Sequence, residues 1–307
     1  MESIQIAAII TCYFPKNEEL TPLLASINNQ VDVIFLVDNG GLANFSIPES
    51  IKSKIEVISA NKNLGTAGGY NLGCRRAWEK KCSHVLLLDQ DSECDQDMVK
   101  NLISLETYLK KNSEKVAVVG PYYICKSNNQ PAPFIQHEGL RIRRIYETDL
   151  NLPKSSNNQK YTPCSYVISS GSLISRQSWN DIGETYDGLF LDFTDIEWGL
   201  RSATKGYQCY GSFDAKMYHI IGDEQLSLLG RKISLHSPLR HYYAFRNCVW
   251  LAKQNYVPGG TRFNYLIKLA PKLLVYSWFS SEPLQQLKSM ILGVKDGIFN
   301  RMGAFQK

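Results

Sequence analysis

His84-Val-Leu-Leu-Leu-Asp89-Gln-Asp91-Ser92 is the stretch that decides the fold, because an apolar run ends in two carboxylates one residue apart. The run predicts a buried β-strand that ends at the edge of a sheet. Successive side chains of an extended chain point to opposite faces, so Asp89 and Asp91 share a face. They can bind one hard cation together with the phosphates or ribose of a ligand. An Asp-x-Asp tripeptide alone is more often a solvated turn after a strand. The residues around it therefore decide whether it is a metal site.

Three more strand patterns precede this one and alternate with helix patterns. The strands are expected at Ile4 to Ile10, Val31 to Val37 and Ile55 to Ser59, with helices near 18–29 and 68–80. Repeated strand and helix units predict an α/β fold, a mostly parallel sheet with helices on both faces. Ligands of such sheets bind at the carboxyl ends of the strands.

Polar residues follow the ends of the four strands, namely Thr11, Asp38, Asn63 and Asp89. We therefore expect four separate segments to meet at one crevice. For Asp38, a turn-forming role before Asn39-Gly40 is an equally good interpretation.

A glycine-rich loop, Asn61-Lys-Asn63-Leu-Gly65-Thr-Ala-Gly68-Gly69-Tyr-Asn71-Leu-Gly73, follows the third strand. Glycines let the backbone approach a bound group, and the helix that follows directs free N–H groups toward it. The spacing and the position after the third strand exclude a dinucleotide-binding fingerprint. A structural tight turn is the remaining alternative.

The composition is that of an ordinary globular protein, with 307 residues, 44% hydrophobic and 21% charged. Eight cysteines without a Cys-x-x-Cys pair, and a start without a signal-peptide pattern, predict reduced thiols in a cytosolic protein. No apolar run approaches twenty residues, so no membrane-spanning helix is expected.

Charge divides the chain into two predicted regions, 1–230 and 231–307. The second holds twelve Lys or Arg and two acids, a net charge of +10, whereas the first has a net charge of −5. Aromatic and aliphatic residues between Phe263 and Phe279 suit a helical region that lies on an anionic bilayer. A helical pair packed on the main domain, with solvated lysines, explains the pattern equally well. No nucleic-acid-binding motif accompanies the charge.

Six segments together resemble a known family. They are Thr11-Cys-Tyr-Phe-Pro15, Val37-Asp38-Asn39, the Asn63 to Gly73 loop, Leu88-Asp89-Gln-Asp91-Ser92, Gly188-Leu-Phe-Leu-Asp192-Phe-Thr-Asp195-Ile-Glu197-Trp198 and Arg240-His-Tyr-Tyr-Ala-Phe-Arg246-Asn247. In this order they are similar to the inverting glycosyltransferases of family 2, rhamnosyltransferase branch, which have the GT-A fold. The resemblance covers most of residues 4–250. It implies a catalytic GT-A domain at 1–230 and a basic, mostly helical extension at 231–307.

The resemblance implies transfer of L-rhamnose from dTDP-L-rhamnose to a saccharide or lipid-linked saccharide of a bacterial surface polysaccharide. We expect the protein at the inner face of the cell membrane, with its extension on anionic lipid or in a homodimer. A UDP-sugar or furanosyl nucleotide is the alternative donor. A catalytically silent nucleotide-sugar-binding subunit is the alternative class. A sugar nucleotidyltransferase is disfavoured, because no glycine-rich basic loop follows the first strand.

The resemblance also implies roles for the donor site. Asp38 would hold the pyrimidine, which Thr11 and Tyr13 would border. The nucleotide would be lined by Asn63, Gly65, Gly68 and Gly69. Asp89 would contact the ribose or a metal-bound water, and Asp91 would bind Mg²⁺ or Mn²⁺. His219 would be a late metal ligand or phosphate contact, with a structural histidine as the alternative.

Asp195 is the candidate catalytic base, because inversion needs one carboxylate to take the proton of the acceptor hydroxyl. Helix-start carboxylates are the alternative interpretation of Asp192 and Glu197. The acidic pair of the family aligns with Thr194 and Asp195, so one acid is absent here.

Arg240 and Arg246 could clamp the diphosphate with paired hydrogen bonds, or could form a basic helix face. The acceptor region is expected near Ser169 to Ser172, with Trp198, His137 and Glu138 as further candidates.

Overall fold

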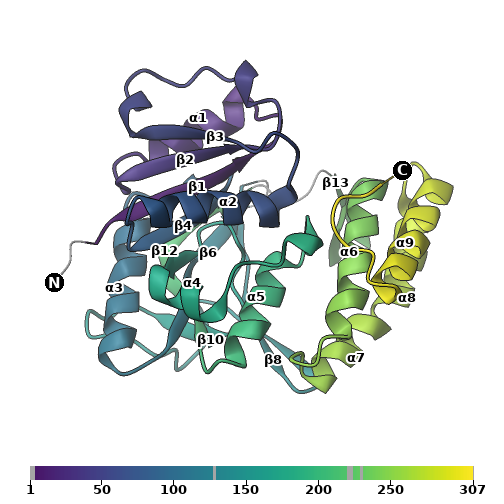
Figure 1. Cartoon of the computed structure of the whole chain (residues 1–307). Helices are drawn as coiled ribbons and strands as arrows, with labels where there is room; N and C mark the ends of the chain where they lie inside the picture. Colours follow the sequence, from purple (N-terminus) through teal and green to yellow (C-terminus); the bar gives the residue numbers. More distant parts are fainter. Residues whose placement is uncertain (1–3, 127–128, 220–223, 229–230, 307) are drawn as a thin grey trace.

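The computed structural model describes residues 4–126, 129–219, 224–228 and 231–306, without the side chains of 219–235. Helices cover a central sheet, and a group of helices stands beside it (Figure 1). The path through the main sheet is β10-β12-β6-β11-β4-β1-β2-β3. These strands are β1 (Ile6–Cys12), β2 (Val33–Asp38), β3 (Ile55–Ser59), β4 (His84–Asp89), β6 (Val116–Cys125), β10 (Tyr161–Cys164), β11 (Leu173–Ser175) and β12 (Gln208–His219).

The sheet is parallel at one end and mixed at the other. β1 lies between β2 and β4, and β2 pairs with β3, all in parallel. β11 runs antiparallel to both β4 and β6. The register sets Thr11 beside Asp89 and Cys12 beside Asp38, so the first two carboxyl ends and that of β4 meet at one edge. The predicted α/β fold is confirmed.

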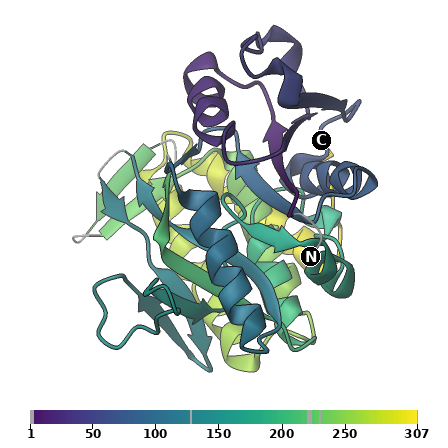
Figure 2. The same ribbon diagram turned by 90° about the vertical axis from the view of Figure 1, so that its left-hand side faces the viewer.

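The alternation of β1 divides the core between the two faces of the sheet. Ile6, Ala8 and Ile10 pack with the buried side of α1 (Asn17–Ile27) and α3 (Met98–Lys111). Ala7 and Ile9 face the opposite core, which also contains residues of α2 (Gly65–Glu79), α4 (Arg176–Ile182) and α5 (Thr194–Ala203). Figure 2 looks onto α3 as it crosses its face of the sheet. A strand buried on both faces explains the uninterrupted apolar runs of the sequence.

Small elements surround this frame. A hairpin pairs β8 (Phe134–Glu138) with β9 (Arg141–Ile145), and a second pairs β13 (Glu224–Leu228) with β14 (Arg231–Leu235). The others are β5 (Glu93–Cys94), β7 (Gln130–Pro131) and the short 3₁₀ helices η1 (Leu42–Asn44), η2 (Lys52–Lys54) and η3 (Asp187–Leu189).

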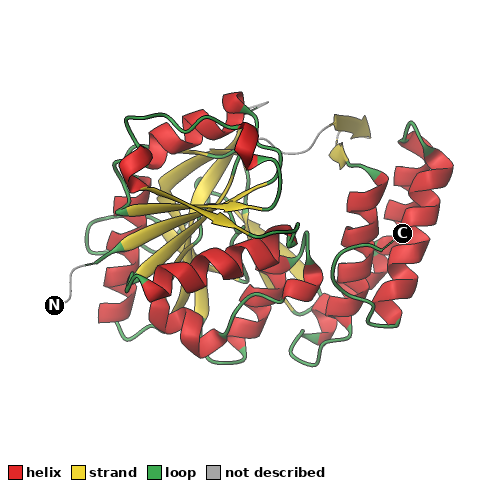
Figure 3. Ribbon diagram, turned by 45° about the horizontal axis from the view of Figure 1, so that its top comes forward, coloured by secondary structure: helices red, strands yellow, loops and turns green. Residues whose placement is uncertain are grey.

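Four helices form the C-terminal group of Figure 3: α6 (Pro238–Ala252), α7 (Gly259–Ile267), α8 (Leu269–Phe279) and α9 (Pro283–Ile298). Trp250, Leu251 and Val257 share a core with Leu189 and Leu200, which ties the group to the segments around α5. In the part of the chain that the structure describes, no helix combines the length and apolarity needed to cross a membrane. The division at residue 230 stays a prediction.

Candidate active site

A groove of about 690 Å³ lies along the carboxyl edge of the parallel strands, and we call it the edge groove. It joins the ends of β1 and β4, the start of α2, the loop after η3 and the start of α6. Its lining residues are Thr11, Tyr13, Glu19, Asn39, Asn63, Gly65, Thr66, Asp89, Gln90, Asp91, Phe190, Leu191, His236, Leu239, Arg240 and Tyr243. Thr11, Asn63 and Asp89 of the four expected residues line this groove, whereas Asp38 does not.

The Asp-Gln-Asp segment is held firmly at this edge. The buried Tyr70 hydroxyl donates to Asp89 Oδ1 at 2.7 Å, and the Asp89 N–H donates to Ser170 Oγ at 3.0 Å. Gln90 Oε1 accepts from the Tyr13 N–H at 2.8 Å, which ties the segment to the loop after β1. Asp89 and Asp91 both line the edge groove.

The carboxylates of Asp89 and Asp91 are of the kind that a small hard cation such as Mg²⁺ binds. Magnesium sites commonly use one or two carboxylates and leave the remaining positions to water and substrate phosphates. In the described residues, no cluster of three or more His, Cys, Asp or Glu could hold a metal. His219 ends β12 beside Cys125, but its side chain lies outside the described part, so its role stays a prediction.

Asp38 has the turn-forming role that was the alternative interpretation. Its Oδ1 accepts from the N–H groups of Gly40 and Leu42, at 2.8 and 3.3 Å. Asp38 is not among the lining residues, whereas its neighbour Asn39 is. The Asn39 amide donates to the Gly65 carbonyl at 2.9 Å and so joins the end of β2 to the start of α2. Pyrimidine binding by Asp38 stays a prediction.

Asn63 and Gly65 both line the edge groove. Asn63 Oδ1 accepts from the Gly65 N–H at 2.8 Å and shapes the turn that opens α2. Gly65 has a φ of +69°, and a Cβ there would lie 2.1 Å from the Phe190 carbonyl oxygen. Only glycine allows this contact between α2 and the loop after η3.

Gly68 and Gly69 do not line the edge groove, which corrects the prediction for both. They lie inside α2 and are buried. A Cβ on Gly69 would lie 2.0 Å from Thr11 Cγ2, and one on Gly68 would lie 2.8 Å from Leu64 Cβ. Their small size serves close packing within α2 and against β1.

Asp195 lies in a second cleft of about 240 Å³, which we call the acidic cleft. This cleft shares Thr66, Asp89, Leu191 and Arg240 with the edge groove, so the two adjoin. Burial, together with the negative charges of Asp192 and Asp89, raises the pKa of Asp195 to about 7. A carboxylate poised near neutral pH is suited to general base catalysis.

The loop that carries this cleft has a strained backbone. Phe190, Asp192 and Phe193 have φ values of 62°, 59° and 67°, in the left-handed region that such residues rarely adopt. Clustered strain of this kind is typical of functional sites. Arg240 lies in both clefts and pairs with Asp192, with Nη2 and Oδ1 3.2 Å apart. Asp192 therefore lies in the loop before α5 and pairs with a residue of α6, so the start of a helix does not explain its place.

Arg246 does not contact the edge groove, and its expected role is corrected. The side chain is 1% exposed, and its guanidinium donates to the carbonyls of Gly188, Leu189 and Gly303 at 3.0, 2.9 and 2.5 Å. It positions the segment that leads to the strained loop and has no donor directed at a ligand in that groove.

Two further candidates, Glu197 and Trp198, have structural roles. Glu197 is paired with Arg201 at 2.6 Å and accepts from the Tyr256 hydroxyl, so its role is structural. Trp198 is buried and its indole N–H donates to the Gly183 carbonyl at 2.8 Å. Trp198 therefore packs the core and is not exposed for stacking on a sugar.

The structure does not bring the acceptor candidates Ser169, His137 and Glu138 together in one site. Ser169 lines that cleft. Burial and the charge of Lys268 lower the pKa of His137 to about 4, so this imidazole is neutral at physiological pH. Glu138 lies 3.9 Å from the Arg143 guanidinium. Tyr123 and Ile168 also line the acidic cleft, and the sequence had no signal for them because each belongs to a short apolar run that is typical of a core strand.

Comparison with known proteins identifies the family. The model of Glycosyl transferase family 2 matches residues 8–183, more than half of the chain. The chain belongs to glycosyl transferase family 2. It is a glycosyltransferase, and its α/β frame is the GT-A fold.

Relatives of this family 2 glycosyltransferase include two with informative names. The dTDP-rhamnosyl transferase RfbF of Shigella flexneri is 30% identical over 297 residues, or 95% of each chain. The galactofuranosyltransferase GlfT1 of Mycolicibacterium smegmatis is 25% identical over 228 residues, covering 72% of this chain and 70% of the relative.

Solved structures agree on the fold. GalNAc-T7 with UDP, GalNAc and Mn²⁺ matches with a TM-score of 0.60 at 13% identity, over 97% of this chain and 56% of the other. TarS 1-349 of S. aureus in complex with UDP-GlcNAc matches with a TM-score of 0.55 at 12% identity, over 96% and 81%.

Proposed function

We propose that this glycosyltransferase transfers L-rhamnose from dTDP-L-rhamnose to a saccharide acceptor, with inversion at the anomeric carbon. The observation that carries the proposal is the adjacency of the edge groove and the acidic cleft, in which Asp195 has a pKa near 7. The 95% coverage by a dTDP-rhamnosyl transferase supports this choice of donor.

In the proposed complex the nucleotide lies in the edge groove. Thr11 and Tyr13 border the base, next to Asp38, and Asn63 and Gly65 line the nucleotide at the start of α2. The helix N-terminus there favours phosphate, because unpaired N–H groups and the positive end of the helix dipole meet at that point.

Mg²⁺ or Mn²⁺ is the proposed cofactor, bound by Asp91 with Asp89 near the ribose or a bound water. When bound, such an ion neutralises charge on the diphosphate as it departs. Arg240 lies between the two clefts and is the proposed guanidinium contact of the leaving group. The Mn²⁺ of GalNAc-T7 supports a divalent ion in this fold.

Asp195 is the proposed catalytic base. The acceptor oxygen forms a bond to the anomeric carbon as the bond from that carbon to the phosphate oxygen breaks. The hydroxyl proton passes to Asp195, and the bonding pair leaves with dTDP. The base and the leaving group must flank the sugar on opposite sides, which the two adjoining clefts permit.

A furanosyl nucleotide or a UDP-sugar is the second candidate donor. The 25% identity to galactofuranosyltransferases over 72% of this chain favours the furanosyl option over an unrelated donor. A silent binding subunit would have no need of a base with a raised pKa beside the donor groove.

We also propose that the acceptor is lipid-linked, in polysaccharide assembly at the inner face of the bacterial cell membrane. Leu274, Trp278 and Leu284 are 69%, 82% and 83% exposed on or beside α8. The region 231–307 has a net charge of +10, which suits an anionic bilayer. Homodimerisation through the same helices is the competing use of this surface.

A donor panel tests the proposed reaction. The protein is incubated with dTDP-rhamnose, UDP-galactofuranose, UDP-galactose or UDP-N-acetylglucosamine, with Mg²⁺ and an extract of lipid-linked saccharides, and released nucleoside diphosphate is measured. We expect the extract to stimulate release of dTDP from dTDP-rhamnose most strongly. Stimulation with UDP-galactofuranose alone would favour the second candidate. No stimulation with any donor would favour the silent subunit.

A further inference from the structure

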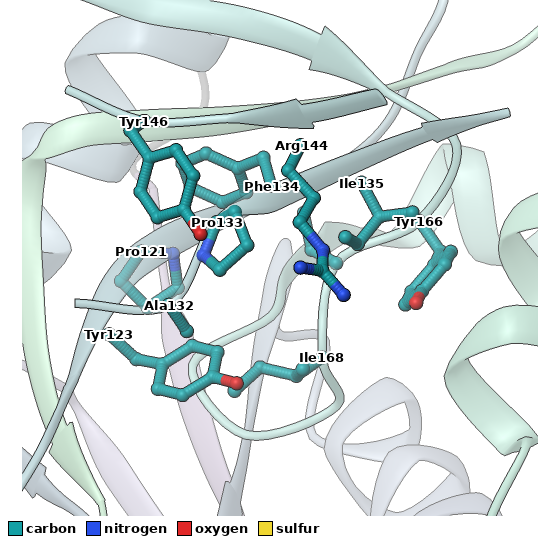
Figure 4. Close-up of a pocket in the computed structure, with 11 residues that line it drawn as sticks. Pro121, Tyr123, Ala132, Pro133, Phe134, Ile135, Arg144, Tyr146, Tyr166 and Ile168 are labelled. Atoms are coloured by element: carbon teal, nitrogen blue, oxygen red, sulfur yellow. The ribbon is translucent and has the colours of Figure 1, made fainter. Parts of the chain in front are cut away.

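A third cavity, of about 310 Å³, lies beyond the acidic cleft and is not part of the donor site. Figure 4 shows it between β6, the β8–β9 hairpin and the segment 166–168, and we call it the aromatic pocket. It has no lining residue in common with the edge groove. No residue expected from the sequence to bind donor or metal lines it.

The aromatic pocket adjoins the acidic cleft but does not share a wall with the edge groove. Tyr123 and Ile168 line both cavities. Burial and the charge of Asp195 together raise the pKa of the Tyr123 hydroxyl to about 12, so this ring lies within electrostatic reach of the base. The three cavities therefore follow one another in the order edge groove, acidic cleft, aromatic pocket.

This order matters for an inverting reaction. The acceptor hydroxyl attacks from the face opposite the leaving group, so the acceptor must reach Asp195 from the side away from the diphosphate. The aromatic pocket adjoins the acidic cleft through Tyr123 and Ile168 and shares no lining residue with the edge groove, so it is a candidate for the acceptor side.

The walls of the pocket suit a sugar ring. Tyr123, Phe134, Tyr146 and Tyr166 line it, and Figure 4 shows the Arg144 side chain among these aromatic residues. Aromatic faces present rigid apolar area to the C–H face of a pyranose, and tyrosine hydroxyls add hydrogen-bonding groups.

Arg144 gives the pocket a positive charge without a carboxylate partner among the described residues. Of the carboxylates on adjacent segments, Glu138 pairs with Arg143 and Glu147 with Lys160, each at 3.9 Å, and Asp149 accepts from the Tyr146 N–H at 3.1 Å. Burial lowers the pKa of Lys268, and the nearby charges of Lys272 and Arg144 lower it further. Several cations thus lie close together, an arrangement that an anionic ligand would stabilise.

We propose that the aromatic pocket is an acceptor subsite that holds a pyranose bearing an anionic group, with Arg144 as the contact of that group. The group is a phosphate of the carrier or the carboxylate of an acidic sugar. This inference rests on the proposed function, because it assigns the acceptor side of the same reaction.

Three octyl glycosides test the subsite by calorimetric binding to the full chain in the presence of dTDP and Mg²⁺. They are neutral octyl glucoside, octyl glucuronide with a carboxylate, and glucosyl diphosphate octyl ester. We expect one of the two charged probes to bind about tenfold more tightly than octyl glucoside, because a guanidinium bonds an anionic oxygen more strongly than a hydroxyl. The tighter of the two identifies the source of the charge.

Arg144→Ala should remove this tenfold preference, whereas Arg143→Ala should keep it. Arg143 is the matched control, because neighbouring strand residues point to opposite faces and Arg143 is not a lining residue. Tyr146→Ala should weaken binding of all three probes, while Tyr146→Phe should retain the neutral one.

Equal binding of the three probes to the parent chain would overturn the proposal, as would a preference that persists in Arg144→Ala. Binding of dTDP alone, measured on the same samples, separates this outcome from failure of the proposed function. If the parent chain binds dTDP but shows no preference among the probes, only the subsite is rejected. If it binds no nucleotide, the proposed function itself is rejected.

Discussion

At the residue scale, the pKa of Asp195 sets the expected pH dependence. The base acts when it is deprotonated, and its pKa is raised to about 7. We expect kcat/KM to rise with pH below about 7 and to level off above it. Asp195→Asn should lower kcat by roughly 10²- to 10⁴-fold, the usual contribution of a general base, with dTDP affinity unchanged. Transfer by this variant at the parent rate would remove Asp195 from the mechanism.

Asp91 carries the expected dependence on metal. We predict that Asp91→Asn raises the Mg²⁺ concentration needed for half-maximal activity by about tenfold, because the carboxylate proposed to bind the ion is lost. Asp97→Asn is the matched control, since this exposed carboxylate lies 3.6 Å from Lys100. Activity that survives complete chelation by EDTA in the parent chain would contradict the metal role.

The sequence predicts the location of a single residue well where its position relative to a strand is enough to place it. Asp89 and Asp91 follow a buried strand, so their place at the sheet edge follows from parallel topology. Arg246 illustrates the limit. Its partners come from residues 188, 189 and 303, so only the folded chain reveals that its guanidinium is already occupied.

At the scale of elements, α2 depends on close contact with β1. Gly69→Ala would place a Cβ 2.0 Å from Thr11 Cγ2, a stiff side chain that also lines the edge groove. We expect a loss of unfolding free energy of about 1–3 kcal/mol, as for an overpacked core. Urea unfolding and the KM for donor measure the two effects.

Gly259→Ala is the control for that substitution. A Cβ at this position in α7 meets no atom within 4 Å, so its effect should be about 0.5 kcal/mol or less and can be stabilising. Equal stability of both alanine variants would show that α2 and β1 tolerate the extra atom.

The sequence predicted α2 from its glycine-rich start but gave the glycines one common function. Gly65 lines the edge groove and allows the close contact with the Phe190 carbonyl, whereas Gly68 and Gly69 serve packing. The distinction depends on which face of α2 meets β1, and spacing alone does not give it. The aromatic pocket was missed for a related reason, because Tyr123, Arg144 and Tyr166 come from three separate segments.

At the scale of the whole molecule, the C-terminal helices are expected to determine where the enzyme works. We predict that the protein sediments with vesicles of phosphatidylglycerol and phosphatidylcholine but not with phosphatidylcholine alone. Leu274→Ser combined with Trp278→Ser should remove this binding, because both side chains are largely exposed.

Leu150→Ser is the control for the vesicle experiment, since Leu150 is 88% exposed but belongs to another part of the sequence. The prediction is contradicted if the parent chain does not bind anionic vesicles and light scattering shows a dimer. These helices would then form an interface between two copies of the chain. The sequence shows that the region 231–307 is basic and rich in aromatic residues. It does not show whether the apolar side chains of this region are buried against the rest of the protein. In the structure no residue of α8 is fully buried.

The structure of the full chain with dTDP and Mg²⁺ bound tests the central claim most directly. It should show the diphosphate in the edge groove, with the metal ion bound to Asp91, Arg240 near the phosphates, and Asp195 on the far side of the sugar position. A diphosphate bound outside this groove, or a metal ion away from Asp91, would contradict the account.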